Sequence, residues 1–173
     1  MQRIHAFNIS PEEYHARGKK NDFPRLDVCP CCSHPSNLQR HGFYWRNALF
    51  RNSHFRIPIL RMKCSSCGKT ISFLPDFLLP YFQYSLEYIL EVAKQYIEER
   101  KATTYYQLLQ FYQRRLLRNL NRILAFFRDQ GYKGVIEEKD KAIKLLKLIG
   151  ASPEAETFAK RFQDHFQHNF MAN

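Results

Sequence analysis

The two Cys-x-x-Cys motifs of this chain, Cys29/Cys32 and Cys64/Cys67, constrain its fold more than any other feature. Two cysteines with this spacing can bind one metal ion from a single tight turn, and two such turns supply the four thiolates of a closed tetrahedral zinc site. One motif is weak evidence for such a site, whereas two separated by 31 residues are strong evidence. We therefore predict one structural Zn²⁺ ion with four ligands: Cys29, Cys32, Cys64 and Cys67.

The residues beside the motifs suit metal-binding turns. Pro30 lies inside the first motif, where its fixed φ helps the turn, and Gly68 follows the second, where a residue that tolerates positive φ is needed. Ser33 occupies the matching place in the first turn, where a glycine would be easier. The local sequence thus supports the metal site at both turns.

Other uses of these cysteines fit less well. A redox Cys-x-x-Cys motif normally begins a helix after a strand, and neither motif here precedes a helical pattern. The chain has five cysteines and no secretory signal, which disfavours structural disulfides. We expect Cys31 to be a non-ligand, although a register in which it replaces Cys29 or Cys32 stays open. Three nearby histidines are reserve ligands: His34, His41 and His54.

The residues between the motifs have room for a two-stranded ribbon. We predict strands at residues 38–45 and 55–63, a polar turn at 47–53, and a third short strand at 70–74. A piece of about 50 residues buries little apolar surface by itself, so we expect it to fold only with its metal. The predicted fold class is α+β: a small N-terminal zinc ribbon of about three short antiparallel strands, followed by an all-α domain of about four helices.

Helical patterns flank the ribbon. Ser10 and Pro11 predict the start of a short helix, and the apolar segment 74–81, with a proline near each end, indicates a domain joint. After Ser85 the pattern is helical to the end of the chain. Further helices are predicted over residues 85–100, 103 or 104 to about 113, 114–128, 137–149 and 153–170. Whether a break separates the second of these from the third stays open, because no Gly or Pro intervenes. The predicted parts are an N-terminal extension (residues 1–27), the ribbon (28–80), a basic helical segment (81–131) and C-terminal helices (132–173).

Charge points to a polyanionic partner. The chain has 27 Lys and Arg against 16 Asp and Glu, a formal charge of +11, which four thiolates on a divalent ion would reduce to about +9. The longest apolar run, residues 123–127, is far too short to cross a bilayer. We expect an intracellular, soluble protein without a membrane partner.

Cations concentrate in the ribbon. Between Cys29 and Phe82 there is one carboxylate, that of Asp76, and interleaved aromatic residues can stack on bases or form the small core. We expect about two-thirds of these aromatic residues to be core. The candidate nucleic-acid contacts are the seven cations of this stretch: Arg40, Arg46, Arg51, Arg56, Arg61, Lys63 and Lys69.

A second cationic stretch lies in the helical half. Between Lys101 and Arg128 there are six cations and no carboxylate. At about 100° per residue, the arginines of segment 114–128 fall within an arc of about 140°, opposite an apolar arc of about 120°. The face is either a solvated basic surface or a phosphate-contacting surface, and we favour the second because a merely soluble helix mixes charge signs. The candidate contacts here are Arg114, Arg115, Arg118 and Arg122.

Four segments together resemble a known family: Cys29-Pro30-Cys31-Cys32, His41 to Arg46, Arg61 to Thr70, and Leu74 to Ser85. They are similar, in order, to the zinc-ribbon front end of bacterial insertion-sequence transposases and of small stand-alone proteins related to them. The resemblance covers about residues 23–90. It implies that a ribbon and a following helix-turn-helix bind DNA of the mobile element. The short second helix, turn and recognition helix of that family are not clear after Arg100, where a long arginine-faced helix is predicted instead.

We therefore expect a non-catalytic, zinc-stabilised DNA-binding protein, a transposon-associated accessory or regulatory factor in the bacterial cytoplasm at the nucleoid. An enzyme is disfavoured because two-metal DNA chemistry needs several converging carboxylates. The alternative is a protein-interaction adaptor of a transposition or transcription complex, or a binder of RNA or single strands. Expected partners are nucleic acid, foremost double-stranded DNA, and a transposase or other protein; a homodimer would use the apolar faces of the last two helices.

Overall fold

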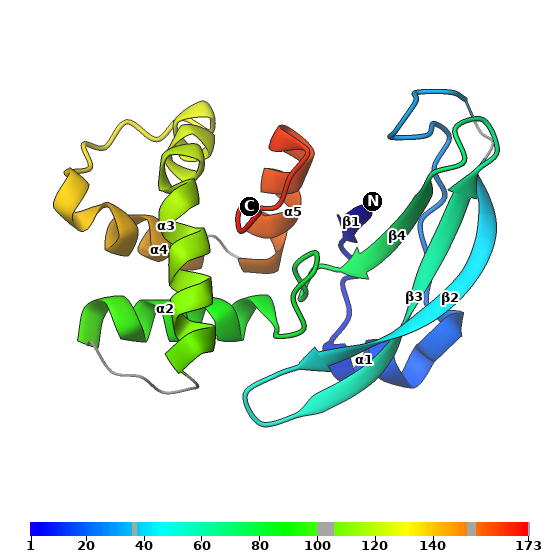
Figure 1. Cartoon of the computed structure of the whole chain (residues 1–173), viewed down its shortest axis with the longest axis horizontal. Coiled ribbons are helices and arrows are strands. Elements are labelled where there is room, and N and C mark those ends of the chain that lie inside the picture. Colours follow the sequence, from blue (N-terminus) through cyan, green and yellow to red (C-terminus); the bar gives the residue numbers. More distant parts are fainter. Residues whose placement is uncertain (36–37, 100–105, 152–154, 173) are drawn as a thin grey trace. The chain divides into compact units, whose positions relative to one another are not determined.

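The computed structural model describes residues 1–35, 38–99, 106–151 and 155–172, and the chain divides into two compact units, Met1–Ser85 and Leu86–Asn173. The described residues form a mixed α/β structure with one four-stranded sheet and five α-helices (Figure 1). None of the described helices has the length and apolar character needed to cross a bilayer.

The sheet is larger than the sequence predicts. The predicted strands are confirmed as β2 (Leu38–Leu49), β3 (His54–Cys64) and β4 (Thr70–Pro75), which pair antiparallel. A fourth strand, β1 (Gln2–His5), pairs parallel with β4, giving the order β1-β4-β3-β2. The prediction of about three short antiparallel strands is therefore incomplete, and β2 and β3 are long, at 12 and 11 residues.

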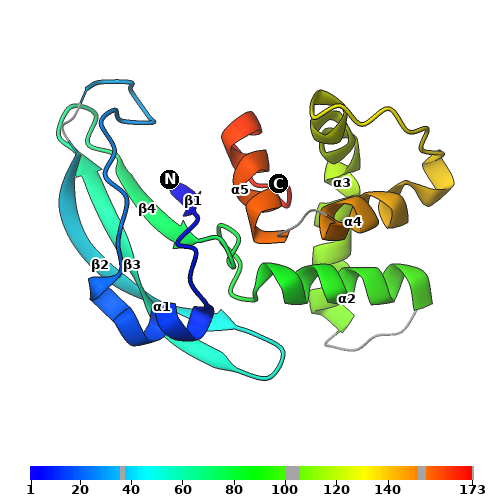
Figure 2. The same ribbon diagram turned by 180° about the vertical axis from the view of Figure 1, so that it is seen from behind.

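The predicted N-terminal helix is confirmed as α1 (Pro11–Arg17), followed by a 3-10 turn at Gly18–Lys20. The Ser10 hydroxyl accepts the Glu13 amide at 3.1 Å, which caps the first helical turn. The helix lies against the sheet, in front of β2 and β3 in Figure 2, and the Tyr14 hydroxyl donates to the carbonyl of Pro58 at 3.0 Å. Burial, and then the nearby Tyr44, raise the pKa of Tyr14, so this hydroxyl stays a donor.

The interleaved aromatic residues of the predicted ribbon mostly pack against an apolar core, although they are only partly buried. Around the buried Tyr14 ring, Phe7, Phe23 and Phe77 make edge-to-face contacts at centroid distances of 4.9 to 6.4 Å. Phe43, Tyr44, Phe50 and Phe55 pack against this core, whereas Trp45 is 49% exposed. The sheet unit therefore has an apolar core in addition to the cysteine turns.

The predicted apolar connector packs against the sheet. Phe77, Leu78 and Leu79 are buried. The Arg46 guanidinium donates to the Leu79 carbonyl at 3.1 Å and to that of Phe82. Burial of the Arg46 side chain lowers the pKa of its guanidinium, and this side chain holds the connector.

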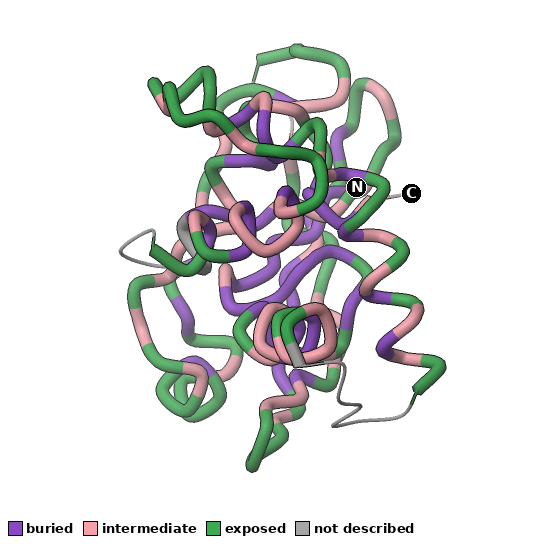
Figure 3. The backbone as a smooth tube through the Cα atoms, turned by 90° about the vertical axis from the view of Figure 1, so that its left-hand side faces the viewer, coloured by how far each residue is buried: buried purple, intermediate pink, exposed green. Residues whose placement is uncertain are grey.

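The helical unit contains α2 (Leu86–Glu99), α3 (Tyr106–Asp129), α4 (Lys141–Ala151) and α5 (Ala155–Phe166), with a 3-10 turn at Glu138–Asp140. Buried and exposed positions alternate along these helices, as the purple and green segments of Figure 3 show. Phe126, Phe158 and Phe162 are buried and in mutual ring contact at 5.4 to 5.8 Å. The apolar faces of the C-terminal helices therefore form ordinary core.

The sequence leaves open whether a break separates a helix ending near residue 113 from one beginning at 114, and the structure shows no break there. Residues 106–129 form one uninterrupted helix, α3, and the predicted caps Thr103 and Thr104 lie outside the described residues. No Gly or Pro interrupts this stretch, so nothing in the backbone chemistry ends the helix. The turn of a helix-turn-helix is not found within residues 106–129.

Candidate metal centre and basic grooves

Two tight turns bring the four predicted ligands to one end of the sheet. The first turn, residues 29–34, lies beside the bridge between Val28 and Pro35, and the second, residues 64–69, connects β3 to β4. Both are seen close together at the same end of the sheet in Figures 1 and 2. Cys64 ends β3 while His54 begins it, so the reserve ligand His54 is held at the opposite end of the sheet.

The backbones of the two turns are hydrogen-bonded in the same way. In each turn, the backbone N–H of the first cysteine donates to the carbonyl of the residue five positions later. The N–H of the residue four positions later donates to the carbonyl of that first cysteine. The bonds are Cys29 to His34 (3.0 Å), Ser33 to Cys29 (2.8 Å), Cys64 to Lys69 (3.0 Å) and Gly68 to Cys64 (2.9 Å). Ser33 and Gly68 both have positive φ, at 55° and 68°, as the sequence predicts. Each turn therefore points two thiols toward one place.

The four sulfur atoms lie at distances suited to one ion. The Sγ atoms of Cys29 and Cys67 are 3.9 Å apart, as are those of Cys32 and Cys64, and all four lie within 4.8 Å of one another. Four ligands at the Zn–S length of about 2.3 Å in a tetrahedron are about 3.8 Å apart. These cysteines could therefore hold one metal ion, and all of them are free of disulfides.

Local hydrogen bonds lower the pKa of two of the thiols, those of Cys29 and Cys64, and so favour their thiolate forms. The backbone N–H of Cys67 is the main cause that lowers the pKa of Cys64 to about 6, against the burial that raises it. The amide two residues on lowers the pKa of Cys29 in the same way. The pKa of Cys32 is raised: the N–H of His34 lowers it, but desolvation and the neighbouring sulfurs outweigh that bond. A cation at the centre would offset the repulsion among the sulfurs and favour four thiolates.

Cys31 lies outside this group of four. Its side chain is partly buried against the apolar core, and its amide donates to the Cys29 sulfur at 3.4 Å. Burial, and then the charges of Cys29 and Cys67, raise the pKa of the Cys31 thiol, so it stays protonated. The register in which Cys31 replaces a neighbouring cysteine is therefore not the one that the structure adopts.

The matched positive-φ positions allow a paired test of the turns. A non-glycine residue in the left-handed region costs roughly 1–2 kcal/mol. We expect Ser33→Gly to stabilise the metal-loaded sheet unit by about 0.5–1 kcal/mol and Gly68→Ala to destabilise it by about 1 kcal/mol. A Cβ at residue 68 would meet no atom within 4 Å, so backbone strain alone is tested there. Thermal unfolding of the zinc-loaded protein measures both changes, and a shift of the same sign in the two variants would contradict the assignment.

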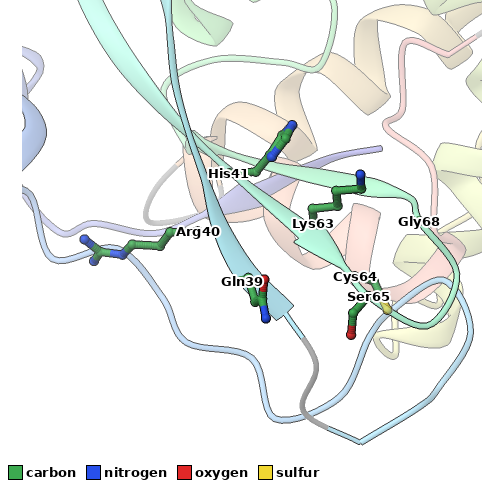
Figure 4. A pocket seen from close by; sticks show the side chains of 7 residues that line it. All are labelled: Gln39, Arg40, His41, Lys63, Cys64, Ser65 and Gly68. Atoms are coloured by element: carbon green, nitrogen blue, oxygen red, sulfur yellow. The ribbon is translucent and has the colours of Figure 1, made fainter.

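A basic groove of about 360 Å³ adjoins the second turn (Figure 4). It is lined by Gln39, Arg40, His41, Lys63, Cys64, Ser65 and Gly68, with no carboxylate among them. The pairing of β2 with β3 shifts register between Arg40 and Phe43, where Gly42 has a φ of 88°. A bulge of this kind changes the direction of the side chains beside it, here that of His41. Figure 4 shows Lys63 and His41 extending to the same side of the strands and Arg40 extending away from them.

A second groove, of about 390 Å³, lies on α3. Its described lining is Gln107, Gln110, Phe111, Arg114, Arg115 and Arg118, again without a carboxylate. Arg114, Arg118 and Arg122 are exposed and spaced four residues apart, and none of them forms an ion pair with a described residue. They form a row of three positive charges along one side of α3.

The remaining predicted nucleic-acid residues are scattered. Arg51 and Lys69 are exposed. The exposed Arg56 lies over the Trp45 ring at 5.7 Å, and the partly buried Arg61 lies over Tyr44 at 5.9 Å. Arg46 instead binds the connector, as described above, and is not brought into either groove.

Arg115 also has a structural contact. Its guanidinium donates to the Met171 carbonyl at 3.0 Å, while the buried Asn119 donates to the Ala172 carbonyl at 2.9 Å, and together they hold the C-terminal segment on α3. The neutral lining residues of both grooves were not predicted, since amides, a hydroxyl and an apolar ring carry no charge signal. These are Gln39, Ser65, Gln107, Gln110 and Phe111.

The fold and the cysteine cluster define the class: a four-stranded sheet with a possible four-cysteine metal site at one end, followed by a helical unit. Residues 29–110 match the model of a family described as a domain of unknown function, DUF6431. No match to curated proteins or to solved structures was found. The matched region begins at the first predicted ligand, Cys29, and ends within α3 at Gln110. The family description states no activity, so the resemblance to transposases stays a prediction.

Proposed function

We propose that this chain is a non-catalytic, zinc-stabilised DNA-binding protein that contacts the phosphate backbone through basic groups on the sheet unit and on α3. The observation that carries the proposal is that each unit has a groove lined by cations and neutral donors, with no carboxylate among the described lining residues. Such surfaces attract phosphate oxygens through charge-assisted hydrogen bonds, and no carboxylate in them repels the phosphates. The formal charge of +11 supports the same class of partner.

Zinc is the proposed ion because four thiolates in a tetrahedral arrangement are typical of structural zinc sites. We further propose that β2, β3 and β4 with the two cysteine turns form a zinc ribbon, extended by β1. Four thiolates around Zn²⁺ carry a charge of about −2. Arg40, Lys63 and Lys69 outnumber that charge, so the loaded turn remains attractive to phosphate.

A role beside mobile elements rests on the resemblance given above. In this proposal the protein is an accessory or regulatory factor at the bacterial nucleoid, and a transposase subunit is the expected protein partner. The sequence supports a non-catalytic role, since the ribbon region contributes the single carboxylate of Asp76 and segment 106–128 contributes none.

A protein-interaction adaptor is the second candidate. It is favoured by exposed aromatic side chains on the sheet unit, where Tyr81 is 75% and Trp45 is 49% exposed. Exposed aromatic residues are enriched in protein interfaces. Under this hypothesis the metal site would stabilise a scaffold, and the partner would contact these rings.

Binding to a labelled DNA duplex tests the proposal. At about 0.5–1.5 kcal/mol for each solvent-exposed contact, the loss of two contacts in the sheet groove should lower affinity by about 5- to 150-fold. We expect this weakening for Arg40→Ala/Lys63→Ala, measured by fluorescence anisotropy on zinc-loaded protein. The matched control is Lys20→Ala/Arg25→Ala, which removes two exposed cations from outside the groove. Equal affinities of the two double variants, or no duplex binding by the native chain at low salt, would reject the proposed contacts.

A further inference from the structure

Because α3 is one continuous helix, Phe111 lies on the same side of it as the arginine row. Counted at about 100° per residue along one helix, Phe111 falls between Arg118 and Arg122, each about 20° away around the axis. With a break near residue 113, the direction of the Phe111 ring would not be fixed relative to these arginines. Phe111 is 43% exposed, so a large apolar ring lies on the same side of α3 as the arginine row, just before its N-terminal end at Arg114.

The surroundings of this ring are ordered by contacts within the helical unit. The Arg115 guanidinium lies over the Phe111 ring at 4.4 Å, and the same guanidinium is tied to the Met171 carbonyl at 3.0 Å. Phe111 also contacts the buried Tyr112 ring at a centroid distance of 5.7 Å. A ring and a cation that are already positioned lose little conformational freedom when a ligand binds.

The other groups of the groove suit a nucleotide. Gln107 and Gln110 offer amide donors and acceptors, which can pair with base edges, and Arg114 and Arg118 offer charged donors for phosphate. The groove volume of about 390 Å³ falls in the size range of small-ligand sites. The described lining holds no carboxylate, which argues against a cationic or basic ligand.

We propose that the α3 groove binds an unpaired nucleotide of single-stranded nucleic acid, with its base stacked on Phe111 and its phosphates contacting Arg114 and Arg118. This inference rests on the proposed function and narrows it, because phosphate contacts alone are compatible with paired or unpaired strands. A base inside a duplex is covered on both faces by its neighbours, whereas an unpaired base can give one face to an aromatic side chain. The groove therefore selects a single strand, a frayed end or a flipped base.

Substitutions at Phe111 test the stacking. Base–aromatic stacking is worth enough that its loss should weaken single-strand binding by roughly 5- to 150-fold. We expect this loss for Phe111→Leu with labelled single-stranded DNA or RNA oligonucleotides, unchanged affinity for the matching duplex, and near-native binding for Phe111→Tyr. Leu117→Ala is the matched control, since Leu117 is 45% exposed on α3 but does not line the groove.

A fluorescent base analogue gives a direct readout of stacking. With 2-aminopurine in the single strand, native protein and Phe111→Tyr should quench the analogue, and Phe111→Leu should not. Thermal unfolding of each variant checks that the helical unit stays folded. Tighter binding of DNA than of RNA would identify a DNA strand as the ligand, the reverse would identify RNA, and either result supports an unpaired nucleotide.

The outcomes separate this inference from the proposed function. If Arg114→Ala/Arg118→Ala weakens binding of every nucleic acid while Phe111→Leu weakens none, phosphate binding stands and the stacking site is rejected. Equal weakening of duplex and single strand by Phe111→Leu also rejects it. If neither single strands nor duplexes bind the native chain, both proposals fail, and an acidic peptide that binds in the groove would replace them.

Discussion

Removal of the proposed zinc ion is expected to unfold the sheet unit, residues 1–85. Structural zinc in small modules contributes roughly 10–16 kcal/mol of apparent binding free energy near neutral pH, as much as the whole stability of a typical domain. Two of the four cysteines, Cys29 and Cys64, are fully buried beside the apolar core. Without the ion, the negative charges of their thiolates would repel each other inside the fold with little screening by water. We expect EDTA, or Cys64→Ser, to abolish the near-UV circular dichroism of the aromatic cluster around Tyr14.

The fifth cysteine supplies the matched control for this experiment. Cys31→Ser changes a thiol in the first cysteine turn but outside the group of four, so it should keep one metal ion per chain and a native near-UV spectrum. Metal content measured before and after EDTA shows whether the ion has left. An unchanged spectrum after proven loss of metal, or metal loss in Cys31→Ser equal to that in Cys64→Ser, would overturn the predicted ligand set.

The cysteine turns could be predicted in detail because they depend on local chemistry. The spacing within each motif determines that its two thiols share a turn, and the positive φ at Ser33 and Gly68 follows from the shape of that turn. Strands β2, β3 and β4 were also predictable, since they are adjacent in sequence and joined by short turns. Local signals of this kind need no knowledge of distant residues.

Features that depend on distant residues were missed. Strand β1 is four residues long and pairs parallel with β4 across about 70 residues of chain, so its own sequence carries no alternation that reveals it. Arg46 counts as a cation in any charge tally, but its direction is set by the carbonyls of the connector. The place of Phe111 on the arginine face depends on whether α3 is continuous through residue 113, which the sequence leaves open.

Strong salt dependence is the second large effect that we expect. If six to ten phosphates are contacted, log K should fall with log salt at a slope of about −5 to −9, and raising salt from 50 to 200 mM should weaken binding about 10³- to 10⁵-fold. Replacing Arg114, Arg118 and Arg122 together by alanine removes three exposed charges from one side of α3. At about 0.9 per phosphate, the slope should become shallower by about 2.7. Anisotropy titrations at four or more salt concentrations measure it.

A charge-matched variant distinguishes direct contacts from the general effect of net charge. Lys133→Ala/Lys139→Ala/Lys160→Ala also removes three positive charges from the helical unit, but none of these lysines lies on α3, and two of them pair with Glu137 and Asp164. Exposed charges more than about 8–10 Å from a phosphate are largely screened near physiological salt, so this variant should leave the slope almost unchanged. An equal decrease in slope for the two triple variants would mean that the arginine row is only part of a diffuse positive field, because counterion release then would not depend on where the charges lie.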